Sequence, residues 1–152
     1  MLLARLVEIT RRLVLAFTFF FGPLVLVSYV YGLSHAENPM ELWGGVPEAW
    51  RTYIVPFMFV AALGFLIYWY IVFFCLEESA VSSMRWPWGE SDGNGEVRLL
   101  LAYAAFLIPS ALWIESTILH IENEYAWTQF LVIGTLLFTS VGNVMLGLLA
   151  YG

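Results

Sequence analysis

Residues 99–121 have the sequence LLLAYAAFLIPSALWIESTILHI, an apolar run without Lys or Arg that is interrupted by Glu115 and His120. A helix needs about 20 apolar residues to cross a hydrocarbon layer about 30 Å thick. In lipid, backbone polar groups have to be satisfied within the segment itself, which a helix achieves. The stretch therefore predicts a transmembrane helix and places the chain among membrane proteins.

Three further runs have the same character: residues 13–33, 52–76 and 126–151 contain no Asp, Glu, Lys or Arg. Of the 152 residues, 61% are hydrophobic and 12% are charged, and the mean hydropathy is +0.81. Soluble domains have about 45–50% apolar and about 25% charged residues. The sequence therefore predicts an all-α membrane protein, with a single domain over residues 1–152 and four spans in an up-down bundle.

Arginine placement predicts the orientation of the spans. Five arginines precede the first span or lie between the second and third: Arg5, Arg11, Arg12, Arg85 and Arg98. Only Arg51 lies in a connection on the other side. Because cytoplasmic connections carry the excess of basic residues, both termini and residues 77–98 are predicted to be cytoplasmic. Residues 34–51 and 122–125 are then on the outer side.

The scarcity of reactive side chains excludes several function classes. All six basic residues are arginine, which excludes a lysine Schiff base and a P-loop lysine. The single cysteine, Cys75, excludes an internal disulfide and thiolate metal clusters. The net charge of −6, with no basic cluster larger than Arg11-Arg12, argues against nucleic-acid binding.

No metal and no cofactor is predicted. The chain has two histidines, His35 and His120, which are too few for a membrane di-iron site. The connection before the third span matches the first half of a calcium-binding loop, with Glu90, Asp92, Asn94 and Gly95. Its twelfth position is Leu101, so the bidentate carboxylate is missing and the segment is interpreted as a turn before a helix.

Glu115 is the most informative single residue, because an ionisable group inside a span is costly and indicates a functional site by default. At a rise of about 1.5 Å per residue, it lies about 9 Å below the outer end of its helix. We expect it to be buried in a polar pocket near the outer side. The predicted ligand-binding residues of this pocket are Glu115, Ser116, His120, Gln129 and Ser28. If the protein is catalytic, Glu115 and His120 are the candidate residues.

Small and polar residues follow one side of the fourth span: Thr128, Thr135, Thr139, Gly142, Asn143 and Gly147. In lipid, small residues let helices approach closely, and hydroxyl and amide groups hydrogen-bond between helices. Asn143, Thr139 and Tyr103 are therefore predicted to be structural polar residues, with Asn143 bonded to Thr18 or Tyr103. Leucine at position 147 is expected to push the helices apart.

Two functions remain open. The leading hypothesis is a non-enzymatic subunit or scaffold that lies in the lipid bilayer and forms a homo- or hetero-oligomer through helix four. The alternative is a membrane enzyme or carrier for a lipophilic or protonatable compound, with Glu115 as proton acceptor. A closed cavity around Glu115, Ser116 and Gln129 favours the alternative, whereas an outward-facing Glu115 favours the subunit.

Overall fold

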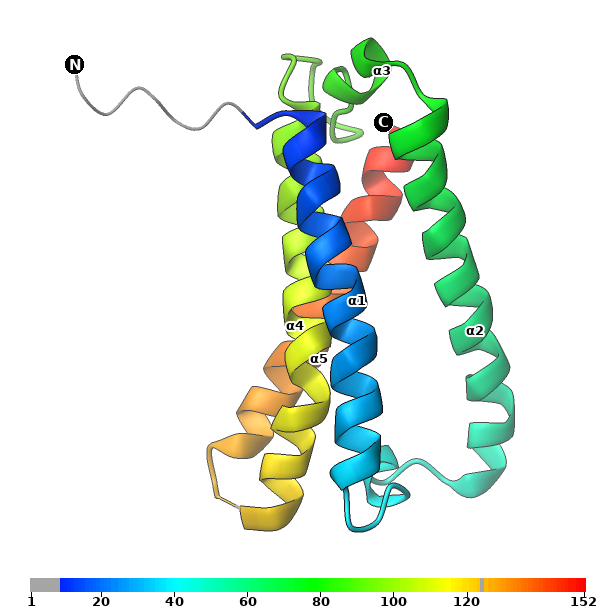
Figure 1. The fold of residues 1–152 in the computed structure, drawn as a ribbon, viewed down its shortest axis with the longest axis vertical. Coiled ribbons are helices and arrows are strands. Elements are labelled where there is room, and N and C mark those ends of the chain that lie inside the picture. The colour runs from blue at the N-terminus through cyan, green and yellow to red at the C-terminus, as the bar shows by residue number, and fades with distance from the viewer. Residues whose placement is uncertain (1–8, 124) are drawn as a thin grey trace, which may run out of the picture.

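The computed structural model describes residues 9–123 and 125–152, and this part of the chain is helical, without a strand. The long helices are α1 (Arg11–His35), α2 (Glu48–Tyr70), α4 (Gly95–Asn123) and α5 (Thr128–Tyr151), and α3 (Glu78–Ser82) is short. A 3₁₀ turn over Glu41–Trp43 precedes α2, and a π-helical turn over Ile71–Cys75 continues it. Figure 1 shows the long helices side by side along one axis.

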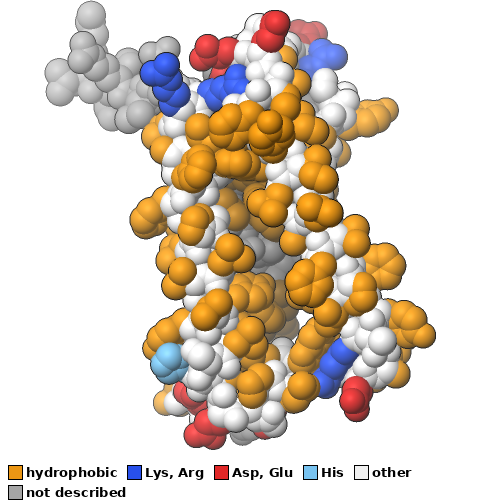
Figure 2. Space-filling model, turned by 45° about the vertical axis from the view of Figure 1, so that its right-hand side comes forward, with side chains coloured by type: hydrophobic (Ala, Val, Ile, Leu, Met, Phe, Trp, Pro, Cys, Tyr) orange, Lys and Arg blue, Asp and Glu red, His pale blue; other side chains and the backbone are white. Residues whose placement is uncertain are grey.

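Four helices are long and apolar enough to cross a membrane: α1, α2 with its π-helical turn, α4 and α5. They overlap the four predicted spans, so the predictions of an all-α chain and of four such helices are confirmed. Figure 2 shows hydrophobic side chains over the middle of the molecule and charged side chains at its two ends. This distribution is the one that a hydrocarbon layer between two aqueous phases requires.

Helix α4 lies at the centre of the packed part of the molecule, with α5 along one side and α1 along another. Leu99, Tyr103 and Leu107 of α4 are buried in the core that it forms with these helices. Two glycines set the helix–helix contacts: Gly142 of α5 lies against the backbone of Phe106, and Gly32 of α1 lies against Ile114. Small residues permit this close approach of the helices. In lipid, the resulting van der Waals packing drives helix association, because the hydrophobic effect does not act between helices there.

Helix α2 is joined to the other helices mainly near its carboxyl end. The Trp69 indole nitrogen donates to Thr18 Oγ1 of α1 at 2.8 Å. A few residues later, Arg11 Nη2 donates to the Val72 carbonyl at 2.8 Å. The last carbonyls of a helix have no hydrogen-bond donor within the helix. Here the Arg11 guanidinium donates to one of these carbonyls. This end of α2 is therefore fixed by two side-chain hydrogen bonds to α1.

The start of α1, the connection between α2 and α4, and the end of α5 lie at the same end of the molecule (Figure 1). Arg85 Nε donates to the Gly152 carbonyl at 3.4 Å, which links that connection to the last described residue. Gly95 begins α4 directly against the Val81 carbonyl of α3, where a Cβ atom would collide. The glycine in the calcium-loop pattern is thus required by packing of α3 on α4.

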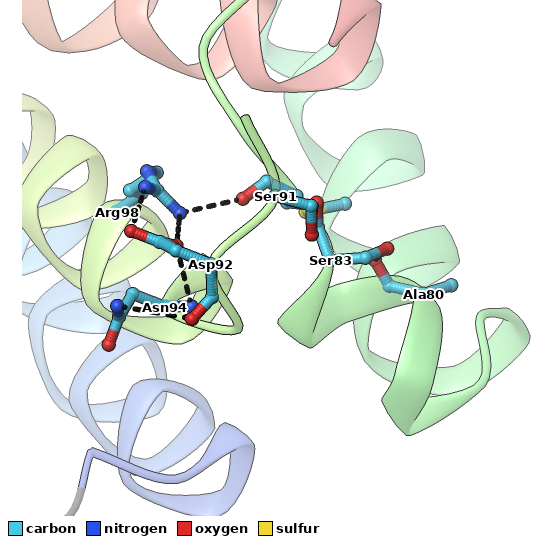
Figure 3. Close-up of polar contacts among 7 residues, drawn as sticks. Ala80, Ser83, Ser91, Asp92, Asn94 and Arg98 are labelled. Atoms are coloured by element: carbon cyan, nitrogen blue, oxygen red, sulfur yellow. Dashed lines mark hydrogen bonds and ion pairs between the residues drawn. The ribbon is translucent and has the colours of Figure 1, made fainter. Parts of the chain in front are cut away.

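The Asp92 carboxylate accepts hydrogen bonds from Arg98 and Asn94 and so holds the connection before α4 in place (Figure 3). Arg98 Nη1 and Nη2 donate to its two oxygens at 2.7 and 2.8 Å, and the Asn94 backbone N–H donates to Oδ1 at 3.0 Å. Arg98 Nη1 also donates to the Met84 carbonyl at 3.1 Å. These hydrogen bonds, those from Arg98 first, hold the pKa of Asp92 well below its usual range. The arrangement agrees with a turn before a helix.

We expect the Asp92–Arg98 pair to stabilise the protein at neutral pH and to lose this effect only in acid. Because the folded pKa of Asp92 is depressed, the contribution is fully present above the unfolded pKa of about 3.9 and falls as the pH decreases through the folded value. Unfolding measured from about pH 7 to about pH 2 should show an acid-dependent loss in the wild type that Asp92→Asn lacks. The loss should be small, since the Asp92 side chain is exposed to solvent. Parallel pH profiles for the two proteins would contradict this assignment.

Candidate functional site

Glu115 does not lie in a pocket. Its side chain is exposed on the outward surface of α4, so the expectation that it is buried is wrong. The neighbouring Ser116 is buried and donates to the Leu112 carbonyl of its own helix at 2.7 Å. Adjacent residues in a helix point about 100° apart, so one of the two can face the bundle while the other faces away from it.

His120, near the carboxyl end of α4, contacts α5 at its first turn. Its Nδ1 lies 2.8 Å from Thr128 Oγ1, and the Thr128 hydroxyl donates to the Tyr125 carbonyl at 2.7 Å. Because that hydroxyl hydrogen is already used, the histidine Nδ1 is the donor to Thr128. The imidazole therefore joins α4 to the first turn of α5.

The other predicted pocket residues are not brought together with Glu115. Gln129 is exposed on α5, and Ser28 of α1 donates to the Val25 carbonyl in its own helix at 2.8 Å. His35 also has local partners, with Nδ1 2.9 Å from the Tyr31 carbonyl and its ring stacked on the Tyr31 ring. In the described ranges, the predicted pocket of Glu115, Ser116, His120, Gln129 and Ser28 is therefore not assembled.

A cleft of about 450 Å³ lies between the segment after α1 and the carboxyl end of α4. Glu37, Glu41 and Glu122 border it, together with Asn38. Asn38 Nδ2 donates to Glu41 Oε1 at 3.0 Å, so part of this polar set is internally satisfied. No group of three or more His, Cys, Asp or Glu residues with metal-binding geometry occurs among residues 9–123 and 125–152.

The polar residues of the fourth span divide between two faces of α5. Thr139 Oγ1 lies 3.3 Å from Ser110 Oγ of α4, and the Ser110 hydroxyl donates to the Phe106 carbonyl, so Thr139 is the donor between the helices. Asn143, in contrast, is exposed. Its predicted bond to Thr18 or Tyr103 does not occur in the described structure, because Thr18 accepts from Trp69 and Asn143 points away from the bundle.

Gly147 also lies on the outward side, with no atom within 4 Å of the position where a Cβ would be. Gly142 and Gly147 were predicted to share one contact face; Gly142 does lie against α4, whereas Gly147 does not contact it. The two glycines are five positions apart, which at about 100° per residue places them about 140° apart around the helix. A single face through both positions is therefore geometrically excluded.

Two features were missed by inspection of the sequence. One is an exposed stripe on α5 that contains Asn143 and Gly147, and its signal was the alternation of four- and three-residue steps. The other is a cleft of about 670 Å³ at the start of α2, lined by Arg51, Trp43 and Met40. The signal for the cleft was the isolated position of Arg51 as the one arginine predicted on the outer side.

Comparison of the chain with family models, curated proteins and solved structures finds no match.

Proposed function

We propose that this protein is a small multi-pass integral membrane protein that acts as a non-enzymatic subunit or scaffold and binds a partner transmembrane helix through the outward face of α5. The four helices cross the bilayer in up-down order, with the described ends of the chain on the cytoplasmic side. The excess of arginine at that end of the molecule supports this orientation. Met1 lies outside the described residues.

The observation that carries the proposal is a stripe of exposed residues on α5: Gln129, Ile133, Leu136, Ser140, Asn143 and Gly147. Their spacing alternates between four and three residues, which is the spacing of a seam between two packed helices. A carboxamide that faces hydrocarbon has unsatisfied hydrogen-bonding groups, and a partner helix satisfies them. Ser140 and Gly147 are small enough for the partner to approach closely.

Glu115 supports the same reading from a second helix. Ionisable residues inside spans almost always face a bundle interior or pair with another group. Glu115 faces away from its own bundle, so a partner subunit is the structural explanation for its position. The alternative of an enzyme or carrier that uses Glu115 has no comparable support, because Ser116, Gln129 and Ser28 do not share a cavity with it.

Association through α5 is testable with the protein alone, since an amide is both donor and acceptor and can pair with its own copy. Energy transfer between labelled copies in lipid vesicles should show that Asn143→Leu lowers the association constant. An interhelical hydrogen bond in a membrane contributes about 0.6–2 kcal/mol, so a decrease of about 3- to 30-fold is expected. Gly147→Leu should also weaken association, without unfolding the monomer.

Phe138→Leu is the matched control, because Phe138 is exposed on α5 but lies off the stripe. A photo-crosslinker at Leu136, used in the native membrane, extends the test to a partner other than a second copy. We expect protein adducts that disappear in Asn143→Leu. Equal effects of Phe138→Leu and Asn143→Leu, or adducts with lipid alone, would refute an α5 interface.

A further inference from the structure

The outer part of α2 stands apart from the other helices. Four consecutive side chains, Phe57, Met58, Phe59 and Val60, are each 49–72% exposed. Consecutive residues point in four directions around a helix, so this part of α2 packs against no other described element on any face. Within α2 itself, core contacts begin only at Phe65 and continue with Tyr68 and Trp69.

A hollow lined by hydrophobic side chains therefore lies between α1 and α2 (Figure 2). Its cytoplasmic end is closed by aromatic packing: the ring centroids of Phe65 and Phe106 are 5.0 Å apart, and Trp69 bonds to Thr18. From Arg51 to Phe65, α2 extends about 21 Å at about 1.5 Å per residue. That length is somewhat more than half of a hydrocarbon layer of about 30 Å, so the hollow belongs mainly to the outer leaflet.

A cleft of about 670 Å³ lies at the start of α2, at the outer end of the segment that borders the hollow. Arg51 is half-buried there: its Nε donates to the Val46 carbonyl at 3.1 Å, and its guanidinium lies 5.6 Å from the Trp43 ring centroid. Nη1 contacts Met40 Sδ at 3.3 Å, a weak acceptor. Glu48 borders the cleft, yet Arg51 forms no ion pair with it or with any other described carboxylate.

We propose that this cleft and hollow bind one anionic phospholipid of the outer leaflet, with the phosphate on Arg51 and an acyl chain between α1 and α2. Guanidinium groups bind phosphate through paired, charge-assisted hydrogen bonds. Trp43 lies beside Arg51, and tryptophan favours the headgroup level of a bilayer. The inference does not rest on the α5 interface, since it involves other helices.

A partner helix fits this hollow less well than a lipid does. A transmembrane helix has to pass through both leaflets, whereas the aromatic packing at Phe65 and Trp69 closes the hollow partway. Water is excluded by the apolar walls, because it would find no hydrogen-bonding partners there. A lipid chain satisfies both conditions, since it ends within one leaflet and has no polar groups along its length.

The test is native mass spectrometry of the detergent-purified protein with added phosphatidylglycerol, phosphatidylcholine or inorganic phosphate. The wild type should bind one phosphatidylglycerol at least about tenfold more tightly than phosphatidylcholine or phosphate. Arg51→Gln should lose at least about tenfold of this affinity, as expected for hydrogen bonds to a charged group. Arg12→Gln is the matched control, since Arg12 is exposed at the opposite end of the molecule.

A second variant tests the hollow itself and does not depend on the arginine. Val55 lines the cleft, so Val55→Trp should displace the lipid, while Val60→Trp, at an exposed position of the same helix, should bind it normally. If Arg51→Gln and Arg12→Gln lose phosphatidylglycerol affinity equally, the lipid is held by nonspecific charge attraction and the proposed site is wrong. Unchanged binding in Val55→Trp, or phosphate binding as tight as lipid binding, would also overturn it. If Val55→Trp changes the oligomeric state and the number of bound lipids stays the same, the hollow between α1 and α2 is covered by a second copy of the chain and not by a lipid.

Discussion

Replacement of Gly142 by leucine is expected to lower the free energy of unfolding by about 3 kcal/mol, the upper end of the usual cost of overpacking. A Cβ at this position would collide with the backbone of Phe106 on α4. Backbone atoms cannot move aside as a flexible side chain can, so α4 and α5 have to separate along their contact. Reversible unfolding in bicelles, followed by the loss of helix or by a steric-trapping assay, measures the change.

Gly147→Leu is the matched control for this prediction. It adds the same side chain to the same helix five residues later, where no atom lies within 4 Å of the Cβ position. The unfolding free energy of the monomer should therefore change little. If Gly147→Leu destabilises the monomer as much as Gly142→Leu does, the packing of α5 on α4 described above is incorrect.

Tyr103→Ala is expected to lower the free energy of unfolding by about 3 kcal/mol, because it leaves a cavity where an aromatic side chain was fully buried. The Tyr103 ring packs edge-on against Phe65, with centroids 6.0 Å apart, and near Phe73 at 5.9 Å. These contacts connect α4 to α2, so the variant should also loosen α2. Hydrogen exchange of the α2 amides in micelles would show this loosening.

Tyr103→Phe separates the ring from the hydroxyl. The buried Tyr103 hydroxyl has no hydrogen-bonding partner among the residues that the structure describes. A buried polar group without a partner costs about 1–3 kcal/mol, so its removal should leave the stability unchanged or raise it by about 1 kcal/mol. A loss of stability in Tyr103→Phe would show that the hydroxyl is satisfied in the membrane-embedded protein.

Helix α2 packs on the other long helices over only part of its length. Its carboxyl-terminal end is fixed by Trp69 and by the Arg11 hydrogen bond to Val72, whereas the side chains of Phe57, Met58, Phe59 and Val60 in its amino-terminal half are exposed. Replacement of Trp69 would therefore remove one of the contacts that hold α2, while the Arg11 hydrogen bond to Val72 and the packing of Phe65 on Phe106 remain. The proposed lipid between α1 and α2 supplies the packing that protein side chains do not provide there.

The sequence alone determined that the chain contains four long apolar helices. Runs such as residues 99–121 are too long and too apolar for water, and lipid allows them no backbone structure other than a helix. The turn at Asp92 was also correctly interpreted, because the missing carboxylate at Leu101 is a local property of the chain. Local composition and spacing are sufficient to predict a long apolar helix or a turn, because both depend on neighbouring residues in the chain.

Only the tertiary structure decided which way each helix faces. In a soluble protein the buried face is the apolar one, but in lipid both faces are apolar, so hydropathy does not distinguish them. Glu115 was therefore placed in a pocket although it faces outward, and Gly147 was grouped with Gly142 on one contact face although Gly147 faces away from α4. The separation of α2 was equally invisible in the sequence, because it depends on side chains from other helices that do not reach it.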